Sequence, residues 1–143
     1  MEKAILGKWE TDQEHGKNKG FEEYHIAIGL DDKVREQFST IRDTLEYVQD
    51  GDNITCNVII GGNVLKTYTG IQKDKEVTIT GVDGKPCLFC YRIENGIWVE
   101  TYKPGDGKGV VVETTKVVKG NKLTITHTVK GKGVTYSYTA TKQ

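Results

Sequence analysis

The stretch Cys87-Leu88-Phe89-Cys90-Tyr91-Arg92-Ile93-Glu94-Asn95-Gly96-Ile97-Trp98-Val99-Glu100-Thr101-Tyr102 holds two runs of strand-type residues separated by Asn95-Gly96. An Asn-Gly pair between such runs indicates a β-hairpin with a two-residue turn. That turn places Ile93 opposite Trp98 and Tyr91 opposite Glu100. Because side chains alternate along a strand, one face of the hairpin carries Cys87, Phe89, Tyr91, Ile93, Trp98, Glu100 and Tyr102. We expect this aromatic face to be the interior of the sheet.

Short strand-type runs separated by turn residues continue along most of the chain. The predicted strands are Gly7–Asp12, Asp43–Gln49, Asn53–Ile60, Val64–Gln72, Glu76–Val82, Pro86–Ile93, Ile97–Lys103, Val110–Val118, Lys122–Val129 and Val134–Thr141. A single sheet of about ten strands tends to curl and close, which removes its exposed edges. The sequence therefore predicts a mainly β fold, a ten-stranded antiparallel up-and-down β-barrel that forms a single domain over residues 1–143.

Residues 20–40 interrupt the strand pattern with helical periodicity. Apolar residues recur at helical spacing in two stripes, Phe21, Tyr24 and Ile28, then Val34, Phe38 and Ile41. Asp31 is suited to cap the second helix, and Gly29 is suited to the junction between the two. We expect a helix-turn-helix lid after the first strand, over a barrel wide enough to enclose a ligand.

The composition excludes several classes of protein. The 143 residues include 20 Lys and Arg and 20 Asp and Glu, so the formal net charge is zero, whereas a nucleic-acid-binding protein needs an excess of basic residues. No apolar run approaches the length of a membrane span, and the first residues lack the pattern of a signal peptide. Three cysteines are an odd number for a secreted disulfide framework. We expect a cytoplasmic protein.

The second half of the chain adds polar residues to the predicted interior. A turn at Gly120-Asn121 places Lys116 opposite Ile125 and Thr114 opposite His127. The interior then contains Glu100, Lys116, His127, Tyr91, Tyr102, Tyr136 and Tyr138. Burying an unpaired charge is costly, so a purely structural core would not select these residues. A hydrated ligand cavity, in contrast, could accommodate these polar residues.

Several segments are similar to the intracellular lipid-binding proteins, the family of the fatty-acid-binding and cellular retinoid-binding proteins. The matching segments are Leu6-Gly7-Lys8-Trp9, Phe21-Glu22-Glu23-Tyr24, Ile28-Gly29, Val34-Arg35, Leu123-Thr124-Ile125-Thr126 and Val134-Thr135-Tyr136-Ser137-Tyr138. The resemblance implies a calycin-like barrel that holds a lipid without covalent attachment and without a cofactor. It also implies a monomer whose partners are a small hydrophobic ligand and, transiently, membranes.

The resemblance also suggests a ligand site. Many family members hold a carboxylate with two inward arginines and a tyrosine near the C-terminus. Here the tyrosine is retained as Tyr138, Tyr136 stands where one arginine is expected, and Lys116 stands at the other arginine position. We expect Lys116, Tyr136 and Tyr138 to contact a ligand head group. The other predicted ligand-binding residues are Glu100, Tyr102, His127, Trp98, Phe21, Tyr24, Val34 and Phe38.

Three roles remain open for Lys116 at this point. It could bind the carboxylate of a long-chain fatty acid, pair with Glu100 or turn outward, or form an imine with an aldehyde. An inward Glu100 disfavours a carboxylate ligand. The alternatives are therefore a carrier of a neutral or aldehyde isoprenoid, such as a retinoid or carotenoid, and an extracellular lipocalin-like protein, since Gly7-Lys8-Trp9 also fits the lipocalin opening.

No catalytic or metal-binding constellation emerges from the spacing. Cys87 and Cys90 are separated as in metal and redox motifs, but on a strand their side chains point to opposite faces. We expect His15 to be solvated, His25 to face outward and His127 to face the interior. The prediction is a carrier with no metal and no catalytic residues, not an enzyme.

Overall fold

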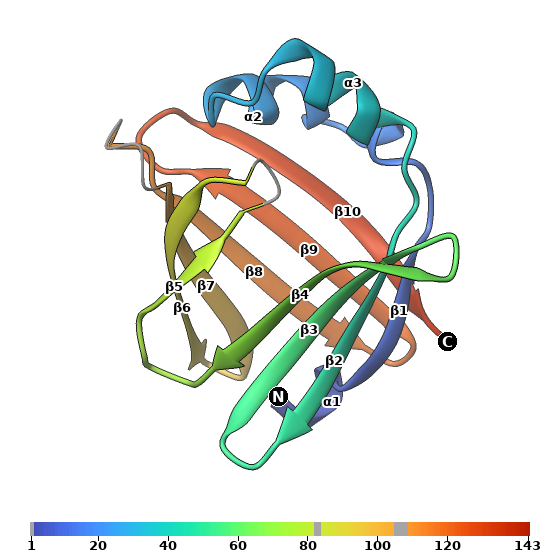
Figure 1. Ribbon diagram of the computed structural model, residues 1–143, viewed down its shortest axis with the longest axis vertical. Helices are drawn as coiled ribbons and strands as arrows, with labels where there is room; N and C mark the ends of the chain where they lie inside the picture. Colours follow the sequence, from blue (N-terminus) through green and yellow to red (C-terminus); the bar gives the residue numbers. More distant parts are fainter. Residues whose placement is uncertain (1, 82–83, 105–108) are drawn as a thin grey trace.

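Ten antiparallel strands form one sheet that rolls into a barrel in the computed structural model, which describes residues 2–81, 84–104 and 109–143 (Figure 1). The strands are β1 (Gly7–Thr11), β2 (Thr44–Asp50), β3 (Asn53–Ile60), β4 (Asn63–Ile71), β5 (Val77–Thr80), β6 (Pro86–Glu94), β7 (Ile97–Pro104), β8 (Val112–Lys119), β9 (Lys122–Val129) and β10 (Val134–Lys142). The helices are α1 (Glu2–Ile5), α2 (Phe21–Ala27) and α3 (Asp32–Ser39), with a short 3-10 helix η1 (His15–Lys17) before α2. The predicted fold class is confirmed, and the strand bounds agree with those expected to within a few residues. Val82, Asp83 and the Gly105-Asp106-Gly107 turn lie outside the described residues.

The barrel is nearly closed rather than fully closed. The strand order is β4-β3-β2-β1-β10-β9-β8-β7-β6-β5, so the first and last strands of the chain pair with each other while β4 and β5 are the two edges. No ladder joins these edges in the described part of the chain, because the four residues of β5 pair with β6 alone. The expectation of a sheet without edges was therefore wrong at this seam.

The hairpin registers agree with those expected from the turn residues. Ile93 lies opposite Trp98 and Tyr91 opposite Glu100 in the β6–β7 ladder. Asn95 and Gly96 both have positive φ, at 51° and 77°, as a type I′ turn requires. The β8–β9 ladder also has the expected register, with Lys116 opposite Ile125. These two registers position the polar side chains of the interior.

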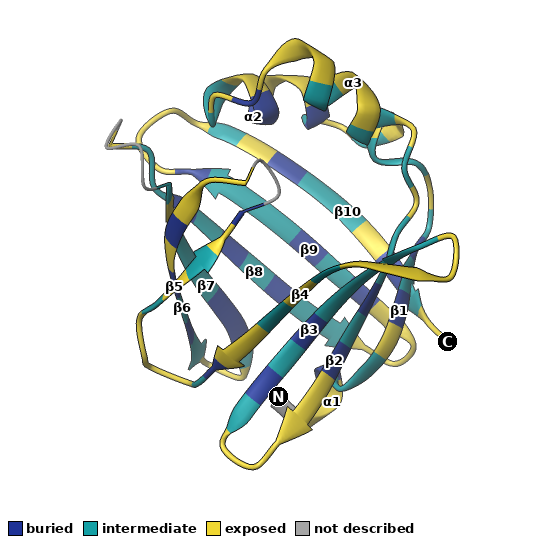
Figure 2. Cartoon of the chain, viewed as in Figure 1, coloured by how far each residue is buried: buried dark blue, intermediate teal, exposed yellow. Residues whose placement is uncertain are grey.

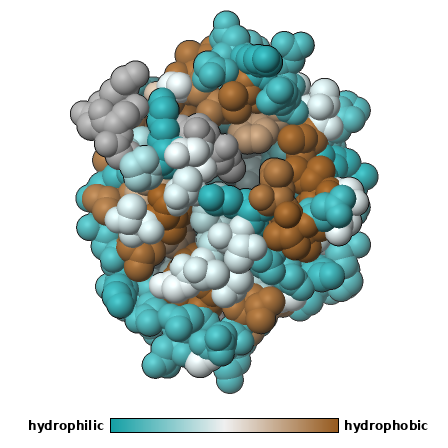
Figure 3. Space-filling model, viewed as in Figure 1, coloured by the Kyte–Doolittle hydropathy of each residue, from teal (hydrophilic) through white to brown (hydrophobic). Residues whose placement is uncertain are grey.

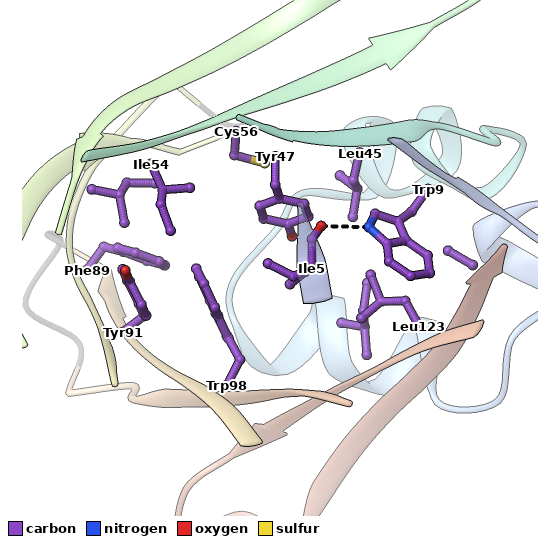
Figure 4. Close-up of a cluster of buried hydrophobic side chains, with 13 residues drawn as sticks. Ile5, Trp9, Leu45, Tyr47, Ile54, Cys56, Phe89, Tyr91, Trp98 and Leu123 are labelled. Carbon is purple, nitrogen blue, oxygen red and sulfur yellow. Dashed lines mark hydrogen bonds between the residues drawn. The ribbon is translucent and has the colours of Figure 1, made fainter. Parts of the chain in front are cut away.

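The end of the barrel opposite the lid is plugged by α1, which the sequence analysis did not predict (Figure 1). Ile5 at its end is fully buried, and the indole Nε1 of Trp9 donates a hydrogen bond to the Ile5 carbonyl oxygen at 2.7 Å. Figure 4 shows this contact within the larger cluster of buried apolar side chains. Four residues of helix carry too little periodicity to be recognised in a sequence.

The lid consists of α2 and α3 above the open end of the barrel. Asp31 caps α3 as predicted, because its carboxylate oxygen accepts from the backbone N–H of Val34 at 2.9 Å. Phe21, Tyr24 and His25 of α2 are buried, whereas α3 buries no residue (Figure 2). Gly20 precedes α2 with a φ of 86°, and a Cβ there would lie 2.0 Å from the carbonyl oxygen of Thr135. Glycine is therefore required where α2 meets β10.

Candidate functional site

A cavity of about 310 Å³ lies between the lid and the interior of the barrel. Figure 3 shows hydrophobic side chains gathered beneath the lid and beside the β3–β4 turn. Ten of the eleven residues predicted to bind a ligand line this cavity: Phe21, Tyr24, Phe38, Trp98, Glu100, Tyr102, Lys116, His127, Tyr136 and Tyr138. They come from the lid and from strands β7 to β10, so the fold brings together side chains that are far apart in the sequence.

The remaining predicted residue, Val34, is not among the described residues that line the cavity. It is half-buried in the first turn of α3. In this part of the lid, the cavity is lined by Phe38 and by Ile41, which follows α3. The second lid helix therefore meets the cavity near its C-terminal end rather than along its length.

An ion pair between Lys116 and Glu100 lies inside the barrel. The Nζ of Lys116 is 2.6 Å from the Oε1 of Glu100, and the two side chains are only 10% and 12% exposed. Lys116 also donates to the hydroxyl of Tyr47 at 2.5 Å, and Trp98 Nε1 donates to the same Glu100 oxygen at 2.9 Å. Of the roles left open for Lys116, pairing with Glu100 is the arrangement present, and an outward orientation is wrong.

Aromatic rings surround the ammonium group of Lys116. Its Nζ lies 4.9 Å from the ring centroid of Tyr47 and 5.8 Å from that of Trp98, within the range of cation–π attraction. Trp98 in turn stacks on Tyr91 with a centroid separation of 3.9 Å (Figure 4). Tyr91 was expected in the interior and is buried there, packed behind Trp98. The ion pair therefore lies beside the aromatic rings of Tyr47 and Trp98.

Tyr47 and Cys56 are cavity residues that the sequence analysis missed. Both line the cavity from β2 and β3. Burial raises the pKa of the Cys56 thiol to about 11, so it is a neutral, unreactive group at neutral pH. Alternation along β2 places Leu45 and Tyr47 on one face, so the rule used for the later hairpins could have found Tyr47.

A second polar cluster lies at the lid end of the cavity. His15 Nε2 is 2.8 Å from Asp43 Oδ1, and His15 Nδ1 is 2.5 Å from the hydroxyl of Tyr136. The expectation that His15 is solvated was therefore wrong. The segment between β1 and α2 folds into η1, and this turn brings the His15 ring against β2 and β10.

His127 is half-buried in the wall of the cavity and faces the interior, as predicted. Its Nδ1 lies 2.7 Å from Thr114 Oγ1, its Nε2 lies 3.3 Å from the Tyr138 hydroxyl, and its ring stacks on Tyr24. Burial, reinforced by the positive charge of Lys116, lowers the pKa of His127 to about 3. The ring is therefore neutral at neutral pH and acts as a hydrogen-bonding group.

His25 faces inward, contrary to the expectation that it lies on the outer face of the lid. Its side chain is buried, and its Nδ1 donates to the carbonyl oxygen of Phe21 at 2.6 Å. Burial lowers the pKa of His25. The reason is helical geometry, since His25 lies four residues after Phe21 and shares its buried face.

In residues 2–81, 84–104 and 109–143 no group of three or more His, Cys, Asp and Glu side chains could hold a metal ion. Cys56, Cys87 and Cys90 do not form disulfides. None of the described helices has the length and apolar character needed to cross a membrane.

Comparison with known proteins identifies relatives. No protein-family model matches the chain. It is 31% identical to gastrotropin of Rattus norvegicus over 94 residues, which cover 65% of this chain and 69% of that protein. It is 28% identical to gastrotropin of Oryctolagus cuniculus over 134 residues, which cover 93% of each.

Solved structures share the whole fold. Fatty-acid-binding protein 1 of Echinococcus granulosus is 22% identical with a TM-score of 0.82, and 98% of each chain is covered. The fatty acid binding protein of Schistosoma mansoni, solved in complex with arachidonic acid, is 20% identical with a TM-score of 0.80, over 98% of this chain and 96% of that one. Lipid binding protein 8 of Caenorhabditis elegans, in its apo form, is 20% identical with a TM-score of 0.85, over 100% of this chain and 98% of that one. At these identities the likeness establishes the barrel and its lid.

Proposed function

The chain belongs to the intracellular lipid-binding protein family, and we propose that it is a non-enzymatic carrier of a long-chain fatty acid or a similar hydrophobic ligand. The observation that carries this proposal is the cavity between the lid and the barrel interior, which is apolar along most of its wall and polar at two places. Such a combination suits a molecule with one long apolar chain and a small polar head.

Burial of the apolar chain supplies most of the affinity in this proposal. Each buried methylene group contributes about 0.8 kcal/mol, so a long chain accumulates a large favourable free energy without specific contacts. Phe21, Tyr24, Leu30 and Phe38 of the lid face the cavity and form part of this apolar wall. The ligand enters beneath the lid, beside the β3–β4 turn, where Leu65 lines the cavity and is 61% exposed.

The proposed carrier has no catalytic step. A general base must accept a proton near the working pH, and His127 in the cavity wall has a pKa of about 3. Tyr136, the hydroxyl beside His15, has a pKa raised by burial, which opposes its use as a nucleophile. Both groups are better suited to hydrogen bonding with a ligand or with water.

A neutral isoprenoid, such as a retinoid or carotenoid, is the second candidate ligand. The observation that favours it is the Lys116–Glu100 ion pair, which leaves the deep end of the cavity without net charge. An aldehyde ligand bound as an imine is disfavoured by the same contact, because Glu100 and Tyr47 already contact the Lys116 nitrogen that would have to attack the aldehyde. Because the chain belongs to the intracellular lipid-binding family, we no longer consider the lipocalin-like alternative.

The proposal includes a cytoplasmic location, a monomeric state and transient contact with membranes during transfer. Mixed charges on the lid give no strong electrostatic attraction to an anionic surface. Arg35 of α3, for example, pairs with Asp32 and Glu22. Contact with membranes would therefore depend on apolar residues near the entrance, such as Ile26 and Leu65, which are 56% and 61% exposed.

Binding of a long-chain probe to the delipidated protein tests this function. A fluorescent fatty-acid analogue is titrated into the wild-type protein, and the dissociation constant and stoichiometry are measured. In Val58→Trp the larger side chain fills part of the cavity, because Val58 is one of the lining residues. We expect this variant to bind the probe at least about tenfold more weakly, a loss of about 1.4 kcal/mol.

Val48→Trp is the matched control, because it makes the same change on the neighbouring strand β2 at an exposed position outside the cavity lining. Thermal unfolding of both variants checks that each is folded. Equal affinity of wild type and both variants would overturn the proposal, since binding would then not use the cavity.

A further inference from the structure

We propose that Glu100 takes the electrostatic place of a ligand carboxylate inside the barrel, so that the cargo is a long-chain lipid with an uncharged, hydrogen-bond-donating head group. This inference rests on the proposed function, because it names the class of lipid that the same cavity selects. An alcohol or an amide has such a head group, whereas the carboxylate of a free fatty acid does not.

The first argument is the charge of the cavity wall. Among the described lining residues Lys116 is the single Lys or Arg, while Asp43 and Glu100 are both acidic. The charge of Lys116 is already matched by Glu100 at 2.6 Å, and Asp43 is held by His15. A carboxylate entering the deep end would find no unpaired cation and would add a negative charge beside Glu100. In a cavity whose wall is mostly apolar, that arrangement is unfavourable.

The remaining hydrogen-bonding capacity of the pair gives the second argument. Both contacts of the Glu100 carboxylate, from Lys116 and from Trp98, fall on Oε1. The described residues form no hydrogen bond to Oε2, and Glu100 lines the cavity, so this oxygen is left to accept from water or from a ligand. A hydroxyl or an amide N–H can donate to it, and a carboxylate cannot.

The ammonium group of Lys116 completes the site. It makes contacts with Glu100 and Tyr47, and its third N–H remains for an acceptor. A hydroxyl head group can accept from Lys116 and donate to Glu100 at the same time. The ion pair therefore selects a head group that can both donate and accept a hydrogen bond. Binding of such a group leaves the net charge of the cavity unchanged.

A series of lipids with one chain and different head groups tests this selection. Oleyl alcohol, oleamide, oleic acid and oleylamine compete in equal amounts for delipidated wild-type protein, and the bound lipids are quantified by mass spectrometry. We expect the alcohol and the amide to exceed the acid by at least about tenfold, which corresponds to about 1.4 kcal/mol. Equal or preferred binding of the acid, or a preference for the amine over the alcohol, overturns the inference.

The variant Glu100→Gln tests the mechanism, because it removes the internal carboxylate and leaves Lys116 without its counter-ion. We expect the ratio of the affinity for oleic acid to that for oleyl alcohol to rise by at least about tenfold in this variant. Glu113→Gln is the matched control on β8, since Glu113 pairs with Arg92 and Lys130 and does not belong to the cavity lining. It should leave the preference unchanged.

The outcomes separate this inference from the proposed function. If none of the four lipids binds to the wild-type protein, the proposed carrier function fails. If the acid binds best to the wild type, the carrier function stands and the role of Glu100 fails. If Glu100→Gln does not fold, the competition among head groups on the wild-type protein decides by itself.

Discussion

The two ends of the barrel are closed in different ways. At the end opposite the lid, α1 inserts Ile5 into the core, and Trp9 bonds to its backbone within a cluster of fully buried apolar side chains (Figure 4). At the lid end, aromatic rings and histidines meet through hydrogen bonds, such as those that join His15 to Asp43 and Tyr136. One end is held by a large apolar core, and the other by a smaller buried cluster around Phe21, Tyr24 and Tyr136 together with a few directional contacts.

This difference indicates which end opens. Apolar packing is lost all at once when a core is disrupted, whereas a lid with little buried surface can separate locally at low cost. The contrast exists within the lid as well, because α2 buries three side chains and α3 buries none. We therefore expect α3 and the adjoining entrance to move before α2 does. Three predictions test this contrast between the ends.

The largest expected effect is at the closed end. Trp9→Ala should lower the free energy of unfolding by about 3–5 kcal/mol, because it removes a fully buried indole and leaves a cavity. Phe38→Ala in the half-buried surface of α3 should cost only about 1–2 kcal/mol. Urea denaturation followed by the fluorescence of Trp98, which both variants retain, measures the two losses. Similar losses would contradict the contrast between the two ends.

The second prediction concerns acid at the polar side of the cavity. The pKa of His127 is about 3 in the folded protein and about 6.5 in the unfolded chain. Between these values the unfolded state binds a proton that the folded state does not. Stability is therefore fully present above pH 6.5 and falls as the pH drops toward 3, by about 1.4 kcal/mol per pH unit.

His127→Gln removes this contribution while keeping an amide that can bond to Thr114 and Tyr138. Between pH 6.5 and 4.5 the variant should lose about 2–3 kcal/mol less than the wild type, as measured by denaturation at each pH. This range lies above the region where Asp12 titrates, since hydrogen bonds from Lys122, Thr139 and Thr141 outweigh burial and hold the Asp12 pKa at about 2. Identical slopes in the two proteins would show that His127 is not the group responsible.

The smallest expected effect is at the N-terminus of α3. Asp31→Ala removes the cap of this helix and should destabilise it locally by about 1 kcal/mol. Because α3 buries no residue, the global free energy of unfolding should change little, while the α3 amides exchange hydrogen faster. Glu36→Ala, which removes an exposed carboxylate from the same helix without touching the cap, is the control. Slower or unchanged exchange in Asp31→Ala would contradict a loosely held α3.

Features that depend on neighbouring residues could be predicted from the sequence, whereas contacts between residues far apart in the sequence could not. The Asn95-Gly96 turn sets the register of β6 and β7 through a few neighbouring residues, and the Asp31 cap depends on a residue three positions away. Both were predicted. His15 was misplaced because its partner Tyr136 is 121 positions away, and no local pattern indicates such a contact.

The sequence by itself determined the strands, the lid and the placing of Glu100 and Lys116 on the inner face, because alternation and turn chemistry act between neighbours. Lys116 and Glu100 are diagonal neighbours on the adjacent strands β7 and β8, whereas only the tertiary structure decided that Tyr47, 69 positions from Lys116, contacts the same ammonium group. Rolling the sheet into a barrel brings distant strands face to face. Whether a buried lysine is available to a ligand depends on what lies across that interior, which no single strand specifies.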